Sequence, residues 1–182
     1  MKRGKKMRLN FLNKWLDGPL TLEGSCNLIM VEHHPVILEM LEQSKHQLEI
    51  LLHSGKYHST LLPQLSRRLF QINKEIGQYI RAEQEYFFPY LKKQSNQESA
   101  CDEYILNTHL LETMQEKHDL FTKALHQQRK IVNNYMIKKD WDTDLKNYIN
   151  HLFLLEKKIQ SWMELERKKL YPYLIKTTRK HE

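Results

Sequence analysis

Apolar residues recur at intervals of three and four along four long stretches of the chain, which predicts four long helices. The first has Ser25 as its N-cap and runs to about His53; the second follows a cap at Ser59 or Thr60 and continues past Phe87. The third contains the stretch 111–125, and the fourth follows a cap at Asp142 or Thr143. The predicted core stripes are Met30, His34, Ile37, Leu38, Leu41, Leu48, Leu51 and Leu52; Leu65, Leu69, Ile72, Ile76, Tyr79, Ile80, Glu83 and Phe87; Leu111, Met114, His118, Phe121 and Leu125; and Tyr148, Leu152, Leu155, Ile159, Trp162, Met163, Glu166 and Leu170.

The connections between these stretches are polar. Gly55 ends the first helix, residues 93–103 form the connector between the two halves, and the loop before the fourth helix spans 133–140. A short helix is predicted over 9–16, stopped by the Asp17-Gly18-Pro19 sequence. We therefore expect a basic N-terminal tail over 1–17, one helical domain over 18–176 and a C-terminal tail over 177–182.

Two sequence patterns occur twice. The stretch Glu83–Leu91, EQEYFFPYL, matches Glu166–Leu174, ERKKLYPYL, at an offset of 83 residues, and the stretch around His34 matches the stretch around His118 at 84. Two matches at nearly one offset indicate an internal duplication. The predicted fold is therefore an all-α, up-down-up-down four-helix bundle built from two duplicated helical hairpins, preceded by a short N-terminal segment.

Composition and charge narrow the functional classes. Five Gly and five Pro in 182 residues leave little room for a sheet, and no apolar run is long enough to cross a bilayer. No hydrophobic segment follows the basic start, and two cysteines indicate a reducing compartment, so we expect a cytoplasmic protein. The net charge of +7 comes largely from the termini, with no nucleic-acid-binding motif, which argues against a nucleic-acid partner.

Each predicted hairpin carries one histidine and one glutamate on its apolar face. From His34 to the first turn, and from that turn to Glu83, the helices span roughly 29 and 35 Å, so the two side chains reach similar heights. The same holds for His118 and Glu166. We expect all four to meet inside one end of the bundle.

A carboxylate buried without a partner is costly, and two of them beside two imidazoles are stabilised by a shared cation. Nitrogen and oxygen ligands suit iron, with manganese and zinc as alternatives. The competing interpretation is that His34–Glu83 and His118–Glu166 are simple hydrogen-bonded pairs and that no metal binds.

These residues resemble the hemerythrin-like family, also called HHE cation-binding domains, over about Gly18 to Leu174. The resemblance rests on Gly-Pro-Leu before the first helix, on Glu-x-His in the first and third helices, and on Glu…Phe-Pro-x-Leu and Glu…Tyr-Pro-x-Leu at the ends of the second and fourth. It implies a four-helix bundle around a non-haem di-iron centre. Family members bind dioxygen, sense oxygen or redox state, handle nitric oxide, or store iron.

The resemblance implies that His34, Glu83, His118 and Glu166 are metal ligands. The family pattern also has a histidine four residues before each glutamate, and here those positions hold Tyr79 and Trp162. An indole has no lone pair for a metal, whereas a phenolate can bind ferric iron, so Tyr79 remains a candidate ligand. Both rings are bulky, which suggests a site that is altered or closed.

No other side chain restores the two missing histidine ligands. His33 would reach the site if its helix were rotated, whereas His151 lies about 22 Å from Glu166 along the helix and His58 belongs to the loop at the opposite end. Glu85 and Glu164 lie off the apolar face and are expected to be solvated.

Three functional hypotheses follow. The first is an altered metal site used in redox or gas sensing, with dioxygen or nitric oxide as ligands, or in metal handling. The second is a metal-free bundle of the same ancestry that serves as a regulatory or protein-interaction module. The third is a self-associating bundle, for instance a dimer, that pairs through the aromatic stretch Tyr86, Phe87, Phe88 and Tyr90. An enzymatic function has the least support, because no nucleophile–base pair or phosphate-binding loop is present.

Overall fold

A computed structural model describes residues 21–57, 60–94 and 101–178, and these residues form helices and no strand. The whole predicted basic tail over 1–17 with its short helix over 9–16, together with His58 and the candidate cap Ser59, lies outside the described residues. The helical segments are α2 (Leu22–Leu28), η1 (Ile29–His33), α3 (His34–His53), α4 (Leu61–Ala82), η2 (Glu83–Phe87), α5 (Phe88–Gln94), α6 (Cys101–Ile131), η3 (Asn133–Tyr135), α7 (Thr143–Lys169) and α8 (Tyr171–Thr178).

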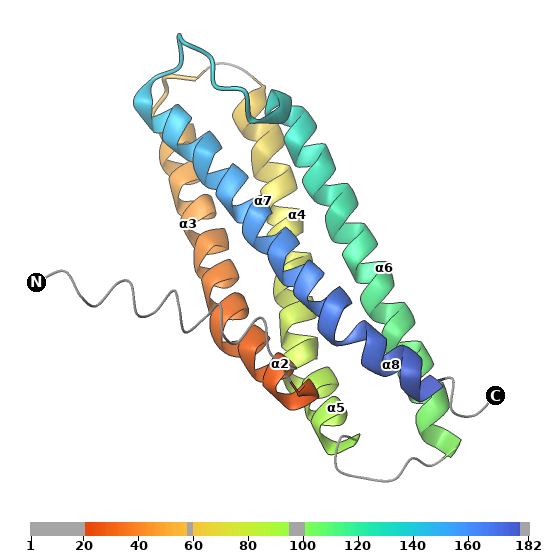
Figure 1. Cartoon of the computed structure of the whole chain (residues 1–182). Helices are drawn as coiled ribbons and strands as arrows, with labels where there is room; N and C mark the ends of the chain where they lie inside the picture. The colour runs from red at the N-terminus through yellow and green to blue at the C-terminus, as the bar shows by residue number, and fades with distance from the viewer. Residues whose placement is uncertain (1–20, 58–59, 95–100, 179–182) are drawn as a thin grey trace, which may run out of the picture.

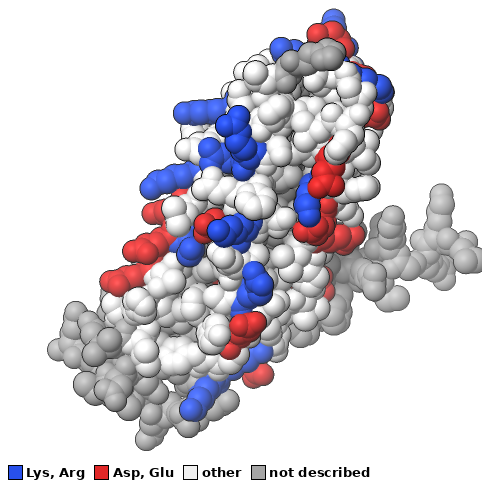
Figure 2. Space-filling model, turned by 180° about the vertical axis from the view of Figure 1, so that it is seen from behind, with Lys and Arg blue, Asp and Glu red and all other residues white. Residues whose placement is uncertain are grey.

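Four long helices lie side by side and enclose one core (Figure 1). Helix α3 contacts α4 and α7, while α6 contacts α4 and α8. The prediction of an all-helical bundle is confirmed at this level. Within the described part of the chain, no helix is both long and apolar enough to cross a membrane. On the face seen from behind, basic and acidic side chains are interspersed with uncharged surface (Figure 2).

The predicted caps are partly confirmed. Asp142 is the N-cap of α7, and its side chain accepts a hydrogen bond from the Leu145 backbone N–H at 2.9 Å. The predicted N-cap of the first helix is wrong: Thr21 caps α2, and Ser25 is buried inside that helix, where its hydroxyl donates to the Thr21 carbonyl. The helix starts earlier because the Thr21 hydroxyl accepts a hydrogen bond from the Gly24 backbone N–H, one of the free N–H groups of the first turn.

Two π-helical turns, η1 and η2, shift the core stripe by one residue. Each turn contains five residues, so the buried positions are Ile29 followed by His34, and Glu83 followed by Phe88. The predicted core position Phe87 is therefore only half-buried, and its neighbour Phe88 takes its place in the core. An α-helical period of 3.6 cannot anticipate a turn with an extra residue.

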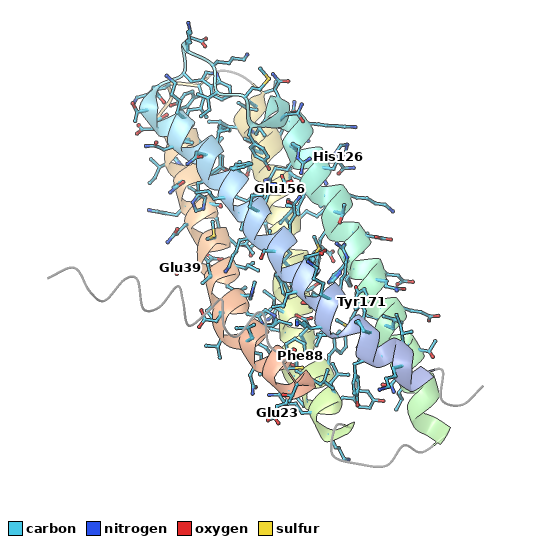
Figure 3. The ribbon with its side chains drawn as sticks, viewed as in Figure 1. Glu23, Glu39, Phe88, His126, Glu156 and Tyr171 are labelled. Atoms are coloured by element: carbon cyan, nitrogen blue, oxygen red, sulfur yellow. The ribbon has the colours of Figure 1, made fainter. Side chains whose placement is uncertain are left out.

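A buried carboxylate, Glu156, lies in the middle of α7 and ties this helix to α6 and η3. Glu156 accepts hydrogen bonds from the Tyr135 hydroxyl at 2.5 Å and from the Gln160 amide at 2.9 Å, and it pairs with Arg129. Figure 3 shows Glu156 well separated along the bundle from Phe88 and Tyr171. Glu156 is a buried acid whose partners come from the chain itself.

Candidate metal centre

The four predicted ligands lie in one cluster inside the bundle. His34 is the first residue of α3, Glu83 the first of η2, His118 lies in α6 and Glu166 near the end of α7. All four side chains are buried, with at most 1% of their surface exposed. The expectation that these four helices bring them to one place agrees with the geometry.

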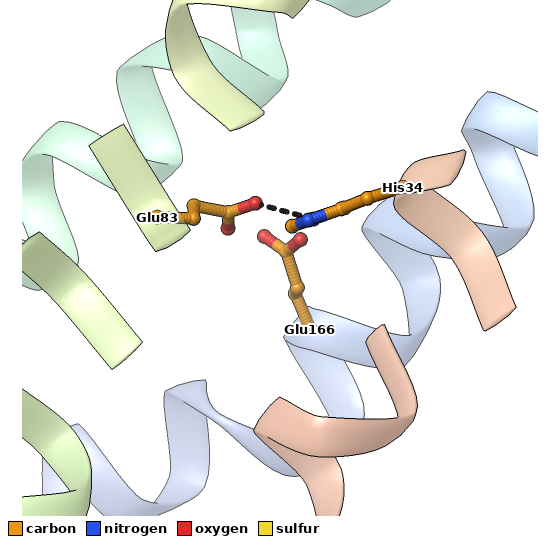
Figure 4. A group of neighbouring side chains, drawn as sticks. All are labelled: His34, Glu83 and Glu166. Carbon is orange, nitrogen blue, oxygen red and sulfur yellow. Dashed lines mark hydrogen bonds and ion pairs between the residues drawn. The ribbon is translucent and has the colours of Figure 1, made fainter. Parts of the chain in front are cut away.

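Direct contacts join each histidine to the glutamate of its own half. His34 Nε2 lies 2.9 Å from Glu83 Oε2, and His118 Nε2 lies 2.8 Å from Glu166 Oε2. Across the halves, His34, Glu83 and Glu166 each offer a ligand atom within 4.8 Å of the other two. Figure 4 shows these three side chains pointing toward one another from α3, η2 and α7. His118 is outside this group of three and joins it through Glu166.

An aromatic ring stacks on each histidine. Phe88 lies parallel to His34 with the ring centroids 5.8 Å apart, and Tyr171 lies nearly parallel to His118 at 5.5 Å. These two rings occupy matching positions of the repeated sequence, 83 residues apart. They hold the imidazoles in fixed orientations.

The Nδ1 atom of each imidazole has its own polar contact. The Tyr171 hydroxyl lies 2.8 Å from His118 Nδ1. Phe88 has no hydroxyl, and in its place the Gln84 amide nitrogen lies 3.2 Å from His34 Nδ1. Histidines that bind metals through Nε2 usually donate the proton of the other ring nitrogen to an acceptor. The Tyr171 hydroxyl can accept from His118 Nδ1, which suits ligation through Nε2 of His118. The Gln84 amide nitrogen only donates, so in the metal-free chain His34 accepts at Nδ1 and donates from Nε2 to Glu83, and ligation by His34 requires this proton to leave.

Burial disfavours the charged forms of the histidine and glutamate side chains in the metal-free cluster. Loss of hydration lowers the pKa of His34 to about 3, helped by the neighbouring His33 charge. Loss of hydration, followed by the Glu166 carboxylate, raises the pKa of Glu83 well above its ordinary value. Without a cation, the cluster holds a neutral imidazole and a protonated Glu83. A bound cation would favour the ionised carboxylate instead.

Two buried oxygens supply a test of whether a metal fits. Apart from the proton that Glu83 shares with Glu166 in the metal-free chain, Glu83 Oε1 and Glu166 Oε1 have no hydrogen-bond partner among the described residues, unlike the carboxylate oxygens of Glu156. A buried acceptor without a partner costs about 1–3 kcal/mol. A cation bound by Glu83, Glu166 and His34 would engage these oxygens. The donor set fits one divalent ion with nitrogen and oxygen ligands.

Tyr79 and Trp162 fill the positions where the resemblance expects histidines. The Tyr79 hydroxyl donates to Glu166 Oε2 at 3.3 Å, and burial raises the pKa of this phenol well above its ordinary value. Trp162 is fully buried, stands edge-on to His34 at 5.4 Å, and its indole N–H has no partner within the described chain. The two side chains do not offer the ligands of a six-ligand di-iron centre, although the Tyr79 oxygen borders the cluster.

The remaining candidates lie elsewhere. His33 is half-buried, its pKa is lowered to about 4 by burial, and it is not part of the group of three. His151 lies 3.0 Å from the Met40 carbonyl through Nε2. Glu85 and Glu164 are exposed.

Sequence reasoning did not identify Tyr171 and Gln84 as partners of the histidines. Tyr171 directly precedes the repeated Pro-Tyr-Leu sequence, and its match to Phe88 was the available signal. Gln84 lies off the apolar face, and no sequence pattern marks it. Comparison with models of known protein families found no match, and comparison with curated proteins found none either.

Proposed function

We propose that the protein is a hemerythrin-like metal-binding protein whose altered centre holds one ion, of iron or alternatively manganese or zinc. The observation that carries the proposal is the buried group of His34, Glu83 and Glu166, whose ligand atoms lie within 4.8 Å of one another and whose two free carboxylate oxygens have, apart from a shared proton, no partner among the described residues. The two repeated sequences support an up-down-up-down bundle built by duplication.

The residues of the chain have distinct roles in this proposal. Glu83 and Glu166 supply negative charge, and His34 supplies a neutral nitrogen ligand. His118 fixes Glu166 through its 2.8 Å contact and is the next ligand available. Because Glu83 is protonated in the metal-free chain, metal binding releases its proton, which makes the affinity rise with pH. A bound iron ion would supply redox chemistry and affinity for dioxygen or nitric oxide.

The second candidate is a metal-free bundle that serves as a regulatory or protein-interaction module. The observation in its favour is that both histidines already contact a glutamate directly, while Tyr79 and Trp162 fill the remaining space. In this case the two His–Glu pairs stabilise the fold, and the chelator-treated protein is the native state.

Elemental analysis of purified protein separates the two candidates. We expect about one iron, manganese or zinc per chain, lost in His34→Ala and Glu166→Ala and retained in His151→Ala, a histidine outside the cluster. Wild-type protein that is metal-free, and whose melting temperature does not respond to any of the three ions, would overturn the metal proposal. In iron-loaded protein, an absorption change on adding dioxygen or nitric oxide favours gas sensing, and its absence favours metal handling.

A further inference from the structure

A groove of about 600 Å³ lies between α3 and α4, and none of His34, Glu83, His118 and Glu166 lines it. Sites for small molecules commonly have volumes of roughly 300–1,000 Å³ and mostly apolar walls with a few polar groups. The α3 wall includes Leu38, Lys45, Leu48, Glu49 and Leu52, the α4 wall includes Leu69, Phe70, Lys74, Gly77, Ile80 and Arg81, and Gln84 of η2 also lines the groove.

One part of the groove is apolar. Leu48 and Leu69 form its buried floor, and Leu52 and Phe70 line it from the two helices. Phe70 is 73% exposed, the largest exposure among the large hydrophobic side chains of the described chain. Covering such a side chain with an apolar ligand removes it from water, which is favourable.

The other part of the groove is basic and has an open space at Gly77. Lys74 and Arg81 lie three residues before and four residues after Gly77, so the two cations flank it on one face of α4. Lys45 lines the same groove from α3, where it pairs with Glu42 at 3.9 Å. The groove therefore carries three cations, with Glu49 as the only acid among its lining residues.

Gly77 has no packing reason within the described chain. A Cβ atom at this position would meet nothing within 4 Å. Glycine is among the poorest helix formers, and its presence in the middle of α4 is unfavourable unless something approaches the helix there. Its absent side chain leaves room for a ligand group between the two cations.

We propose that this groove binds a fatty acid of medium chain length and holds its carboxylate. The acyl chain lies along the apolar part, over Leu48, Leu69 and Phe70, and the carboxylate lies beside Gly77, between Lys74 and Arg81. Phe70 and Gly77 are separated by roughly 10 Å along α4, a span suited to an extended acyl chain of medium length. This inference does not depend on the metal proposal.

Charge and size favour this ligand over others. A second copy of the chain would bring the same row of cations against itself, and the basic segment 1–14 would be repelled by it. The groove volume lies in the range of small-molecule sites. A stable protein interface needs an extended surface, about 800 Å² on each partner. A single-chain amphiphile with one negative end meets both the charge and the volume.

The proposal is tested with sodium laurate, kept below its micelle concentration, on chelator-treated full-length protein by isothermal titration calorimetry. We expect one laurate per chain, and about tenfold weaker binding of uncharged methyl laurate. Gly77→Leu fills the open space and should abolish binding, while its melting temperature stays equal or rises. Lys74→Gln combined with Arg81→Gln should weaken laurate binding about tenfold, and Lys123→Gln, an exposed lysine of α6, should not.

Three outcomes would overturn the proposal. The first is that laurate does not bind to the wild type. The second is that the Gly77→Leu variant and the Lys74→Gln, Arg81→Gln double variant bind laurate as tightly as the wild type does. The third is that an acidic helical peptide or anionic vesicles bind while free laurate does not. The double variant keeps the test decisive if Gly77→Leu does not fold, because its two substitutions lie on the surface. Since the protein is metal-free throughout, failure here leaves the metal proposal untouched, and loss of the metal proposal leaves this one untouched.

Discussion

Replacing Glu83 with glutamine should change stability in opposite directions with and without metal. Glutamine keeps the shape and one carbonyl oxygen but cannot ionise. In the metal-free wild type, the folded chain holds a proton on Glu83 that the unfolded chain loses above its ordinary pKa of 4.5. The contribution of Glu83 to stability therefore falls as the pH rises from 4.5 toward the raised pKa, by about 1.4 kcal/mol per pH unit. Glu83→Gln removes this loss, so we expect the metal-free variant to be the more stable one at neutral pH.

With metal present, the same substitution removes a ligand. A metal ion at a hundredfold excess over its dissociation constant stabilises the folded chain by about 2.7 kcal/mol, which raises the melting temperature of a chain of this size by roughly 5–11 °C. Glu83→Gln should lose most of that rise. The assay is a thermal melt followed by circular dichroism, in chelator and in added iron, manganese or zinc, at several pH values.

Glu156→Gln is the matched control. Glu156 is equally buried, but its carboxylate accepts hydrogen bonds from Tyr135 and Gln160 and pairs with Arg129. Arg129 is 37% exposed, so losing this pair should cost less than about 3–5 kcal/mol, the value for a fully buried ion pair, and the cost should be the same with and without metal. A Glu83→Gln variant that keeps the full metal-dependent rise, or that shows the same fall in stability with pH as the wild type, would refute the reasoning.

Three further predictions concern other parts of the molecule. In metal-free protein, the contribution of His34 and His33 to stability should fall as the pH decreases from 6.5 toward 3, because both have lowered pKa values in the folded chain and the unfolded chain takes up their protons first. Between pH 6.5 and 4.5 the Glu83 contribution changes in the opposite direction, so the measurement is the difference in urea midpoint between the wild type and His34→Gln against pH; a difference that does not change with pH would contradict the prediction. Tyr171→Phe removes the hydroxyl beside His118 Nδ1 and should weaken metal binding about tenfold by calorimetry, whereas unchanged affinity would exclude a role for that contact. Gly77→Ala should raise the melting temperature by about 2–4 °C, since alanine favours a helix by about 1 kcal/mol over glycine and meets no neighbour here; a lower melting temperature would show that the position is crowded.

The sequence predicted the helices and the meeting of the four polar side chains because both depend on regular spacing. Leu152, Leu155 and Ile159 follow the helical period of α7 and are fully buried. The position of Glu83 relative to His34 followed from equal distances to a shared turn, which only requires a constant rise per residue.

Regular spacing could not predict the local departures from the α-helical period. Neighbouring apolar residues occur at Ile29–Met30 and at Phe87–Phe88, so the pattern fits an α-turn and a π-turn equally well, and the choice depends on packing against other helices. Leu52, expected in the core, is 39% exposed for a related reason: it lies beside Leu51 near the end of α3, and Leu51 alone faces inward. The contacts of Gln84 and Tyr171 depend on side-chain direction, which periodicity does not describe.

The two halves of the molecule hold their histidines in unequal ways. The Nδ1 atom of His118 contacts the hydroxyl of Tyr171, which lies in the core. The Nδ1 atom of His34 contacts the amide of Gln84, an exposed residue that also borders the groove between α3 and α4. The Gln84 amide thus links the His34 ring to the protein surface, whereas the Nδ1 partner of His118 is buried. A molecule that binds at the surface beside Gln84 should therefore affect His34, in the first hairpin, and leave His118, in the second, unchanged.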